Sequence, residues 1–149
     1  MSELTIRAAW PDDREEWREL FRAYGVFYET EFDDAVLDTV WEQLLADGSG
    51  IDALVADLDG TLVGLAHYRS HPDTFSGGLD WFLDDLFVDP EARGAGIATA
   101  LIEHLIGLAS VSRPAGKLRW ITAADNERAQ RVYDRLAKKT TWVTYEVAL

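Results

Sequence analysis

The chain of 149 residues contains no cysteine. Disulfide bonds, thiolate metal ligands and a cysteine nucleophile are therefore excluded together, and the composition fits a reducing compartment. No run of about 18 apolar residues is present, so the sequence predicts no membrane-spanning helix. Residues 1–5 lack the basic and then apolar pattern of a secretory signal. We therefore expect a cytoplasmic protein with no membrane partner.

Basic residues are scarce in the first two-thirds of the chain. Residues 1–92 hold 22 acids and 5 bases, net −17, whereas residues 93–149 hold 5 acids and 9 bases, net +4, which together give −13. Such acidity argues against nucleic acid as a partner, because its phosphates would be repelled. The acidic part of the chain could hold a cation at one end of a site, and the basic part could hold an anion at the other. An organism whose proteins are all acidic would produce the same excess.

Several well-known catalytic motifs are also missing. The sequence has no Gly-Lys-Ser/Thr phosphate loop, no His-Glu-x-x-His, no Gly-x-Ser-x-Gly and no paired run of metal ligands. We therefore expect no metal site and no serine-hydrolase chemistry.

Hydrophobic periodicity predicts one α/β domain that covers residues 1–149. Period-two segments and turn signals predict strands over residues 4–8, 51–58, 61–70, 81–88, 118–123 and 140–147. Apolar stripes at helical spacing predict helices around residues 14–27, 36–45, 97–109 and 126–136. The order β-α-α-β-β-β-α-β-α-β favours a mixed sheet with flanking helices.

Two glycines open the helix that follows strand 81–88. Gly94 and Gly96 directly precede the periodic segment from Ile97, and Arg93 precedes them. Free backbone N–H groups at a helix start bind phosphate, glycine lets the phosphate approach, and arginine adds a bidentate contact. A plain turn that uses glycine for its backbone dihedral angles is the alternative. A dinucleotide fingerprint fits less well, because residues 89–93 separate the strand from the first glycine.

A second constellation lies on the helix after residue 125. Asn126 and Tyr133 are seven residues apart, so they share one helix face. Asparagine could bond an amide of an extended ligand, and a phenol could protonate a leaving group. Asn126 could equally be a helix cap, and Tyr133 a core residue.

Together these segments resemble the GCN5-related N-acetyltransferase superfamily, over essentially the whole chain. Residues 93–98, Arg-Gly-Ala-Gly-Ile-Ala, match its Arg/Gln-x-x-Gly-x-Gly/Ala signature, and residues 126–133 match its Asn-x-x-Ala-x-x-x-Tyr helix. Residues 83–88, Leu-Asp-Asp-Leu-Phe-Val, are similar to the strand of the diamine and histone/polyamine acetyltransferases.

The resemblance implies a mostly antiparallel sheet, splayed at its centre, with acetyl-CoA in the gap between strands 81–88 and 118–123. Tyr133 would protonate the leaving thiolate, and Asp84 would be the general base, through a water because aspartate is shorter than the family's usual glutamate. Asn126 and Ala129 would contact the pantetheine arm. The arm and the pyrophosphate would lie on two backbone segments, namely Leu86, Phe87 and Val88, and Arg93, Gly94, Ala95, Gly96, Ile97 and Ala98.

The acceptor implied is a primary amine, in particular a small cationic amine or polyamine, attacked directly in a ternary complex. Asp85, on the opposite side of the strand from Asp84 by simple alternation, is expected to position that amine. Tyr28, Glu29 and Glu31 follow the first helix and are candidate amine contacts, and His67 is a candidate second base. Two alternatives are an acetyltransferase of protein lysines or amino termini and a CoA-binding module without catalysis.

The segment from residue 141 to 147 is β-rich and carries few charges. Such a strand is a poor bare edge, so we expect a homodimer that covers it. The resembling family commonly has a glycine after the tyrosine helix, whereas residues 136–140 contain none. The geometry of this last strand is therefore the least constrained part of the fold.

Overall fold

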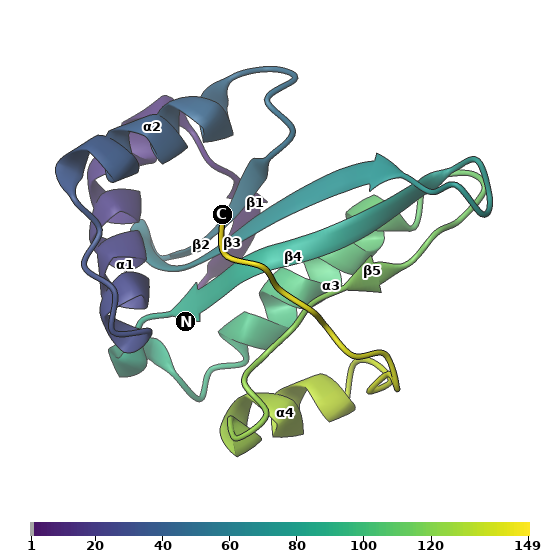
Figure 1. Ribbon diagram of the computed structural model, residues 1–149. Coiled ribbons are helices and arrows are strands. Elements are labelled where there is room, and N and C mark those ends of the chain that lie inside the picture. The colour runs from purple at the N-terminus through teal and green to yellow at the C-terminus, as the bar shows by residue number, and fades with distance from the viewer. Residues whose placement is uncertain (1) are drawn as a thin grey trace.

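The computed structural model describes residues 2–149 and contains one five-stranded sheet of order β1-β2-β3-β4-β5 (Figure 1). The first four strands pair antiparallel, and β5 pairs parallel to β4. This confirms the predicted α/β domain with a mixed, mostly antiparallel sheet. The strand bounds are β1 Leu4–Ala8, β2 Asp52–Leu58, β3 Thr61–Pro72, β4 Leu79–Val88 and β5 Leu118–Arg119.

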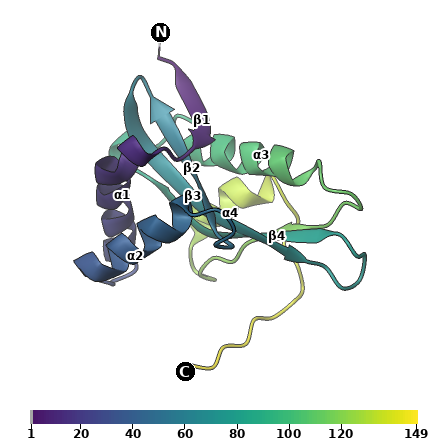
Figure 2. The same ribbon diagram turned by 90° about the horizontal axis from the view of Figure 1, so that it is seen from above.

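Four helices flank the sheet, with α1 and α2 on one side and α3 on the other (Figure 2). Within residues 2–149, none is long and apolar enough to cross a bilayer. The bounds are α1 Arg14–Phe27, α2 Asp34–Leu45, α3 Ile97–Ala109 and α4 Glu127–Asp134, with short 3-10 turns at Pro11–Asp13 and Pro90–Ala92.

Both faces of the central strands are buried, which explains their continuous apolar runs. Successive β2 residues alternate between two cores: Val55 packs with Trp17 and Leu37 of α1 and α2, whereas Leu54 packs with Leu101 of α3. The sheet is therefore clamped between helices, and a functional cavity must lie at an end of the sheet or where two strands separate.

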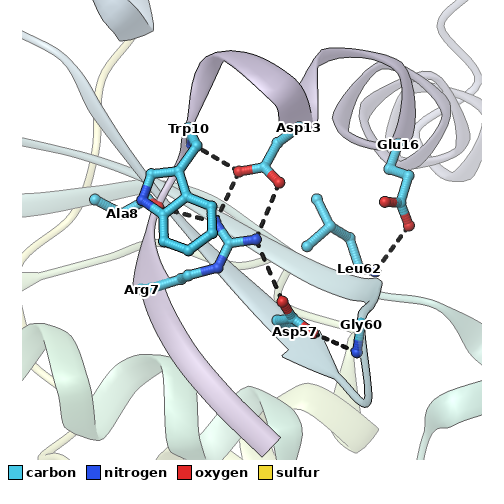
Figure 3. Close-up of polar contacts among 8 residues, drawn as sticks. All are labelled: Arg7, Ala8, Trp10, Asp13, Glu16, Asp57, Gly60 and Leu62. Atoms are coloured by element: carbon cyan, nitrogen blue, oxygen red, sulfur yellow. Dashed lines mark hydrogen bonds and ion pairs between the residues drawn. The ribbon is translucent and has the colours of Figure 1, made fainter.

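Arg7 of β1 ties the start of α1 to the sheet (Figure 3). Its guanidinium contacts both carboxylate oxygens of Asp13 at 2.8 and 3.0 Å and reaches Asp57 of β2 at 3.3 Å. It also stacks on the Trp10 ring, 3.6 Å from the centroid. Glu16 of α1 accepts the Leu62 backbone N–H at 2.9 Å. These contacts fix where α1 leaves the sheet, and α1 carries part of the candidate site.

A β-bulge interrupts the alternation of β4. His67 of β3 is registered with Asp85, but the next β3 residue, Tyr68, is registered with Leu83, so Asp84 has no partner on β3. The expectation that Asp84 and Asp85 face opposite sides is wrong for this reason. Asp84 contacts Arg69 and Asp85 contacts His67, and these two β3 residues share one face because they are two apart.

Two expected strands differ in the structure. β5 covers two residues rather than the predicted 118–123, because it separates from β4 after Arg119. Residues 140–149 form no strand: they are extended and exposed, with Tyr145 at 93%, and they project away from the sheet (Figure 2). A strand forms only where a neighbour supplies hydrogen bonds, and within residues 2–149 this segment has no such neighbour.

Candidate active site

The separation of β4 and β5 opens a wedge in the sheet. The two strands pair at Trp81 with Leu118 and at Phe82 with Arg119, whereas β4 runs on to Val88. Buried Asp80 pins the closed end, since its carboxylate accepts the Lys117 N–H at 2.8 Å and contacts Arg119 at 3.2 Å. Beyond this point the β5-facing backbone of β4 is free to bond an extended ligand.

The wedge leads into a cavity of about 580 Å³ between α1, β4, the start of α3 and α4. Most of the residues predicted to bind the cofactor line it, and so does Tyr28; Ala95, Asp84, Asp85, Glu29 and Glu31 do not. The lining residues are Tyr24, Phe27, Tyr28, Leu86, Phe87, Val88, Arg93, Gly94, Gly96, Ile97, Ala98, Thr99, Asn126, Arg128, Ala129, Val132, Tyr133 and Arg135.

One end of the cavity is suited to phosphate. Gly94 and Gly96 have φ of 91° and 72°, a left-handed conformation that glycine adopts without strain. Gly96 is the N-cap of α3 and offers no side-chain cap, so the first N–H groups of the helix remain available to an anion. Arg93 lines the same cavity and adds positive charge. The lining also includes Arg128 of α4 and Arg135, which caps the end of that helix. Both belong to the basic last third of the chain, in which the charge division predicts an anion site.

Asn126 and Tyr133 lie on the α4 wall of the cavity. The Asn126 side-chain oxygen accepts the Ala129 N–H at 3.2 Å, so the residue caps α4 and its amide nitrogen remains available as a donor. The Tyr133 ring packs edge-on against Trp120 with centroids 5.5 Å apart. Burial, with a smaller contribution from Tyr28, raises the pKa of Tyr133, so its phenol stays protonated at neutral pH.

The two β4 acids have different neighbours. Asp84 is held by Arg69, whose Nε lies 3.2 and 3.0 Å from its two carboxylate oxygens. Asp85 accepts from His67 Nδ1 at 2.9 Å, and its side chain is 24% exposed. Tyr24, on the wall of the cavity, is close to Asp85: burial and then the charge and hydrogen bonding of that carboxylate raise the pKa of Tyr24. Asp85 therefore lies just behind the α1 wall of the cavity.

His67 is 1% exposed, and both of its ring nitrogens are engaged, by Trp17 and by Asp85. It has no direct access to an acceptor, so the expectation that it could be a second base is wrong. Glu29 and Glu31 are exposed and stand outside the cavity.

The sequence analysis missed Tyr24 because it lies on the apolar stripe of α1 and looks like a core residue. Of the arginines in the helical segment of residues 126–136, Arg128 and Arg135 line the cavity. They are seven positions apart and therefore share one helix face. Within residues 2–149, no group of three or more histidine, aspartate or glutamate side chains is placed to hold a metal ion.

Comparisons with known proteins agree with this arrangement. Residues 14–137 match the model of the acetyltransferase (GNAT) family. The chain is 30% identical to the D-amino-acid N-acetyltransferase HPA3 of Saccharomyces cerevisiae, over 96% of this chain and 89% of that protein. It is 29% identical to the L-amino acid N-acetyltransferase AaaT of Escherichia coli, over 91% of this chain and 82% of that protein.

Solved structures show the same fold. A ribosomal-protein-alanine N-acetyltransferase from Brucella melitensis biovar Abortus 2308 superposes with a TM-score of 0.83 at 27% identity, covering 99% of this chain and 100% of that one. The aminoglycoside N-acetyltransferase AAC(6')-Iy, solved in complex with CoA, gives a TM-score of 0.81 at 26% identity, covering 99% of this chain and 96% of that one.

The splayed sheet, the glycine turn at α3 and the tyrosine on α4 define an acyltransferase that uses a CoA thioester. The chain belongs to the acetyltransferase (GNAT) family, and it is an N-acetyltransferase that uses acetyl-CoA.

Proposed function

We propose that this enzyme transfers the acetyl group of acetyl-CoA to the amine of a small cationic molecule, with polyamines as preferred acceptors. The observation that carries this is the charge of the first 92 residues, net −17. All five arginines in that stretch, Arg7, Arg14, Arg18, Arg22 and Arg69, are already ion-paired with aspartates. The remaining negative field favours cationic acceptors and speeds their capture.

In this proposal the coenzyme lies along the wedge. The N–H groups at the start of α3 and Arg93 bind the pyrophosphate, and the free backbone edge of Leu86–Val88 pairs with the pantetheine arm. Asn126 donates its amide N–H to the same arm. The placement of the pyrophosphate rests on the left-handed glycines and on the arginine side chains around them, which suit an anionic ligand and not an apolar one.

The chemistry requires an uncharged amine. An aliphatic ammonium has a pKa of about 10.4, so about one molecule in 10³ is nucleophilic at pH 7, and the site must take up a proton. The neutral amine nitrogen then bonds to the thioester carbon and loses a second proton to the carboxylate base, while the carbon–sulfur bond breaks and Tyr133 gives its proton to the leaving sulfur. A backbone N–H of β4 near Leu86 stabilises the oxyanion. With no cysteine to carry the acyl group, attack is direct.

Amino acids are a second candidate class of acceptor. The two relatives named above act on D- and L-amino acids. Arg69 uses its Nε for both contacts with Asp84, which leaves the two terminal amino groups of its guanidinium for a substrate carboxylate. Arg69 lies on the same sheet face as Asp84 and Asp85. The carboxylate of an amino acid could therefore contact Arg69 while its ammonium contacts an aspartate.

The deciding experiment is a panel of acceptors measured as kcat/KM: spermidine, a monoamine of matched length, D- and L-amino acids, and a peptide with a free amino terminus. The polyamine proposal requires spermidine to exceed the monoamine at low salt, with the advantage shrinking between about 0.01 and 0.5 M salt as the screening length falls. Equal values at low salt would mean that the acidity is a background property. A preference for amino acids that Arg69→Gln abolishes would establish the second class.

A further inference from the structure

We propose that Asp85, rather than Asp84, is the carboxylate that receives the acceptor amine and its proton, and that Trp17 and His67 are positioning residues that hold it. The inference rests on the proposed function and deepens it. It follows from a chain of side chains, Trp17, His67 and Asp85, that begins in the core of α1 and ends beside the cavity.

The first link fixes the tautomer of His67. The indole Nε1–H of Trp17 lies 2.9 Å from His67 Nε2, and an indole nitrogen can only donate. His67 Nε2 must therefore be an unprotonated acceptor. The single ring proton then resides on Nδ1, and the imidazole is neutral. Trp17 is fully buried, so water does not compete for this bond.

The second link fixes Asp85. The Nδ1–H of His67 points at Asp85 Oδ2 over 2.9 Å, so the imidazole can only donate to the carboxylate and cannot take its proton. Tyr24 of α1 is also near this carboxylate, since burial and then the charge of Asp85 raise the pKa of the Tyr24 phenol. The His67 N–H holds the carboxylate in one orientation, as an amine-binding anion requires.

The same cluster continues to the leaving-group end of the site. The Tyr24 and Tyr28 rings have centroids 4.9 Å apart, and both residues line the cavity. Tyr28 in turn is close enough to contribute to the raised pKa of Tyr133. Asp85 and Tyr133 thus stand at the two ends of one line of phenols along the cavity wall.

Asp84 is less suited to the role, although it is the residue at the family position. The Arg69 guanidinium already neutralises it, and Arg69 also covers the Phe82 ring at 4.8 Å. A carboxylate paired with a cation attracts an ammonium weakly. The neighbours of Asp85, His67 of β3 and Tyr24 of α1, are uncharged, so the negative charge of Asp85 remains available to an ammonium.

The proton balance of the step is simple. The acceptor arrives as an ammonium, so a first proton passes to Asp85, directly or through one water, and on to solvent, which frees the nitrogen lone pair. As the neutral nitrogen bonds to the acetyl carbon and the carbon–sulfur bond breaks, a second N–H bond breaks and its proton passes to Asp85. Tyr133 loses its proton to the sulfur in exchange. Asp85 ends protonated and Tyr133 ionised, and proton exchange with solvent restores both groups before the next turnover.

The test compares two pairs of variants in the full chain. Asp85→Asn should lower kcat/KM by about 10²-fold or more, and at least tenfold further than Asp84→Asn, while acetyl-CoA affinity measured by calorimetry stays within a few-fold.

Trp17→Phe should lower kcat about tenfold, because the His67 tautomer is then no longer fixed. Its matched control is Trp81→Phe: Trp81 is also a largely buried indole, but its Nε1 has no hydrogen-bond partner within residues 2–149. Rates are scaled to the folded fraction.

Positioning by His67 has its own readouts. His67→Asn keeps an N–H near the position of Nδ1 and should retain more activity than His67→Leu. In the unmodified protein, nitrogen NMR should show His67 with a protonated Nδ1 and a bare Nε2, and this measurement needs neither activity nor a folded variant.

Three results would overturn the assignment: a protonated His67 Nε2, equal losses for Asp84→Asn and Asp85→Asn, or equal effects of the two tryptophan changes. Each of these can occur in an enzyme that acetylates amines normally. Failure of the wild type to acetylate any amine in the panel would instead count against the proposed function.

Discussion

Tyr28 and Tyr133 come from the end of α1 and from α4, yet their phenols are close enough to influence each other across the cavity. Burial raises the pKa of Tyr133 first, and Tyr28 adds to it, so this phenol is protonated at every pH at which the enzyme is expected to work. A group in this state can donate a proton but cannot act as a base.

The first prediction concerns that proton. Tyr133→Phe keeps the ring against Trp120 but removes the donor, so kcat should fall about 10²-fold or more with acetyl-CoA affinity changed little. Tyr68→Phe is the control, because Tyr68 is also a partly buried tyrosine with a raised pKa, but it stacks on Trp81 instead of lining the cavity. Similar rates for both variants would show that the Tyr133 phenol is structural.

The second prediction concerns the glycine turn. Gly96→Glu should abolish acetyl-CoA binding, because it places a negative charge where the pyrophosphate is expected and strains a left-handed residue. Gly48→Glu is a close control, since Gly48 has φ of 74°, Gly96 has 72°, and a Cβ at either meets no atom within 4 Å. Calorimetry should show binding lost in the first variant and kept in the second. Retained affinity in a folded Gly96→Glu would refute the placement of the pyrophosphate.

The third prediction concerns acid stability. Burial alone would raise the pKa of Asp13, but hydrogen bonds from Arg7 and the Trp10 N–H outweigh it, and the pKa is lowered. A lowered folded-state pKa contributes stability above about pH 4, and this contribution is lost as the pH falls through the folded value. Asp13→Asn should cost about 3 kcal/mol at pH 7 and flatten the loss below pH 4. Urea titrations at several pH values test this, with exposed Asp12→Asn expected to behave like wild type.

The fourth prediction concerns assembly. Residues 141–147 carry exposed apolar side chains, including Trp142, Val143 and Val147. A cavity of about 690 Å³ separates this segment from β5. We predict a homodimer in which the segment is covered, so light scattering should give twice the 16.7 kDa chain mass. Val143→Lys with Val147→Lys should shift the mass toward the monomer, whereas a wild-type monomer at micromolar concentration would contradict the prediction.

Local patterns were enough to predict much of the fold and of the coenzyme end of the site. The glycines before Ile97 and the spacing of Asn126 and Tyr133 are features of single segments, and the structure brings them to one cavity. Strand-like segments bounded by turn signals located β1 to β4, and burial on both faces leaves long apolar runs in β2 and β3.

The acceptor end was harder to predict because it depends on relations between segments. The bulge at Asp84 is set by the register of β4 against β3, which no count along one strand reveals. Tyr24 has the spacing of a core residue, and only the fold shows that it ends beside Asp85. The extended tail likewise has a strand's composition but, within residues 2–149, no strand beside it.

The bulge gives β4 a change of phase. Odd- and even-numbered residues exchange sides of the sheet at Asp84, so Leu83 and Leu86 pack in the same core although they are three positions apart. A single extra residue thereby places two carboxylates on one surface without changing the length of any loop. Deleting it would rotate every earlier side chain of the strand to the other side. Relatives can therefore be aligned through this strand only if the extra residue is matched, and the acidity of the site depends on that insertion as well as on residue identity.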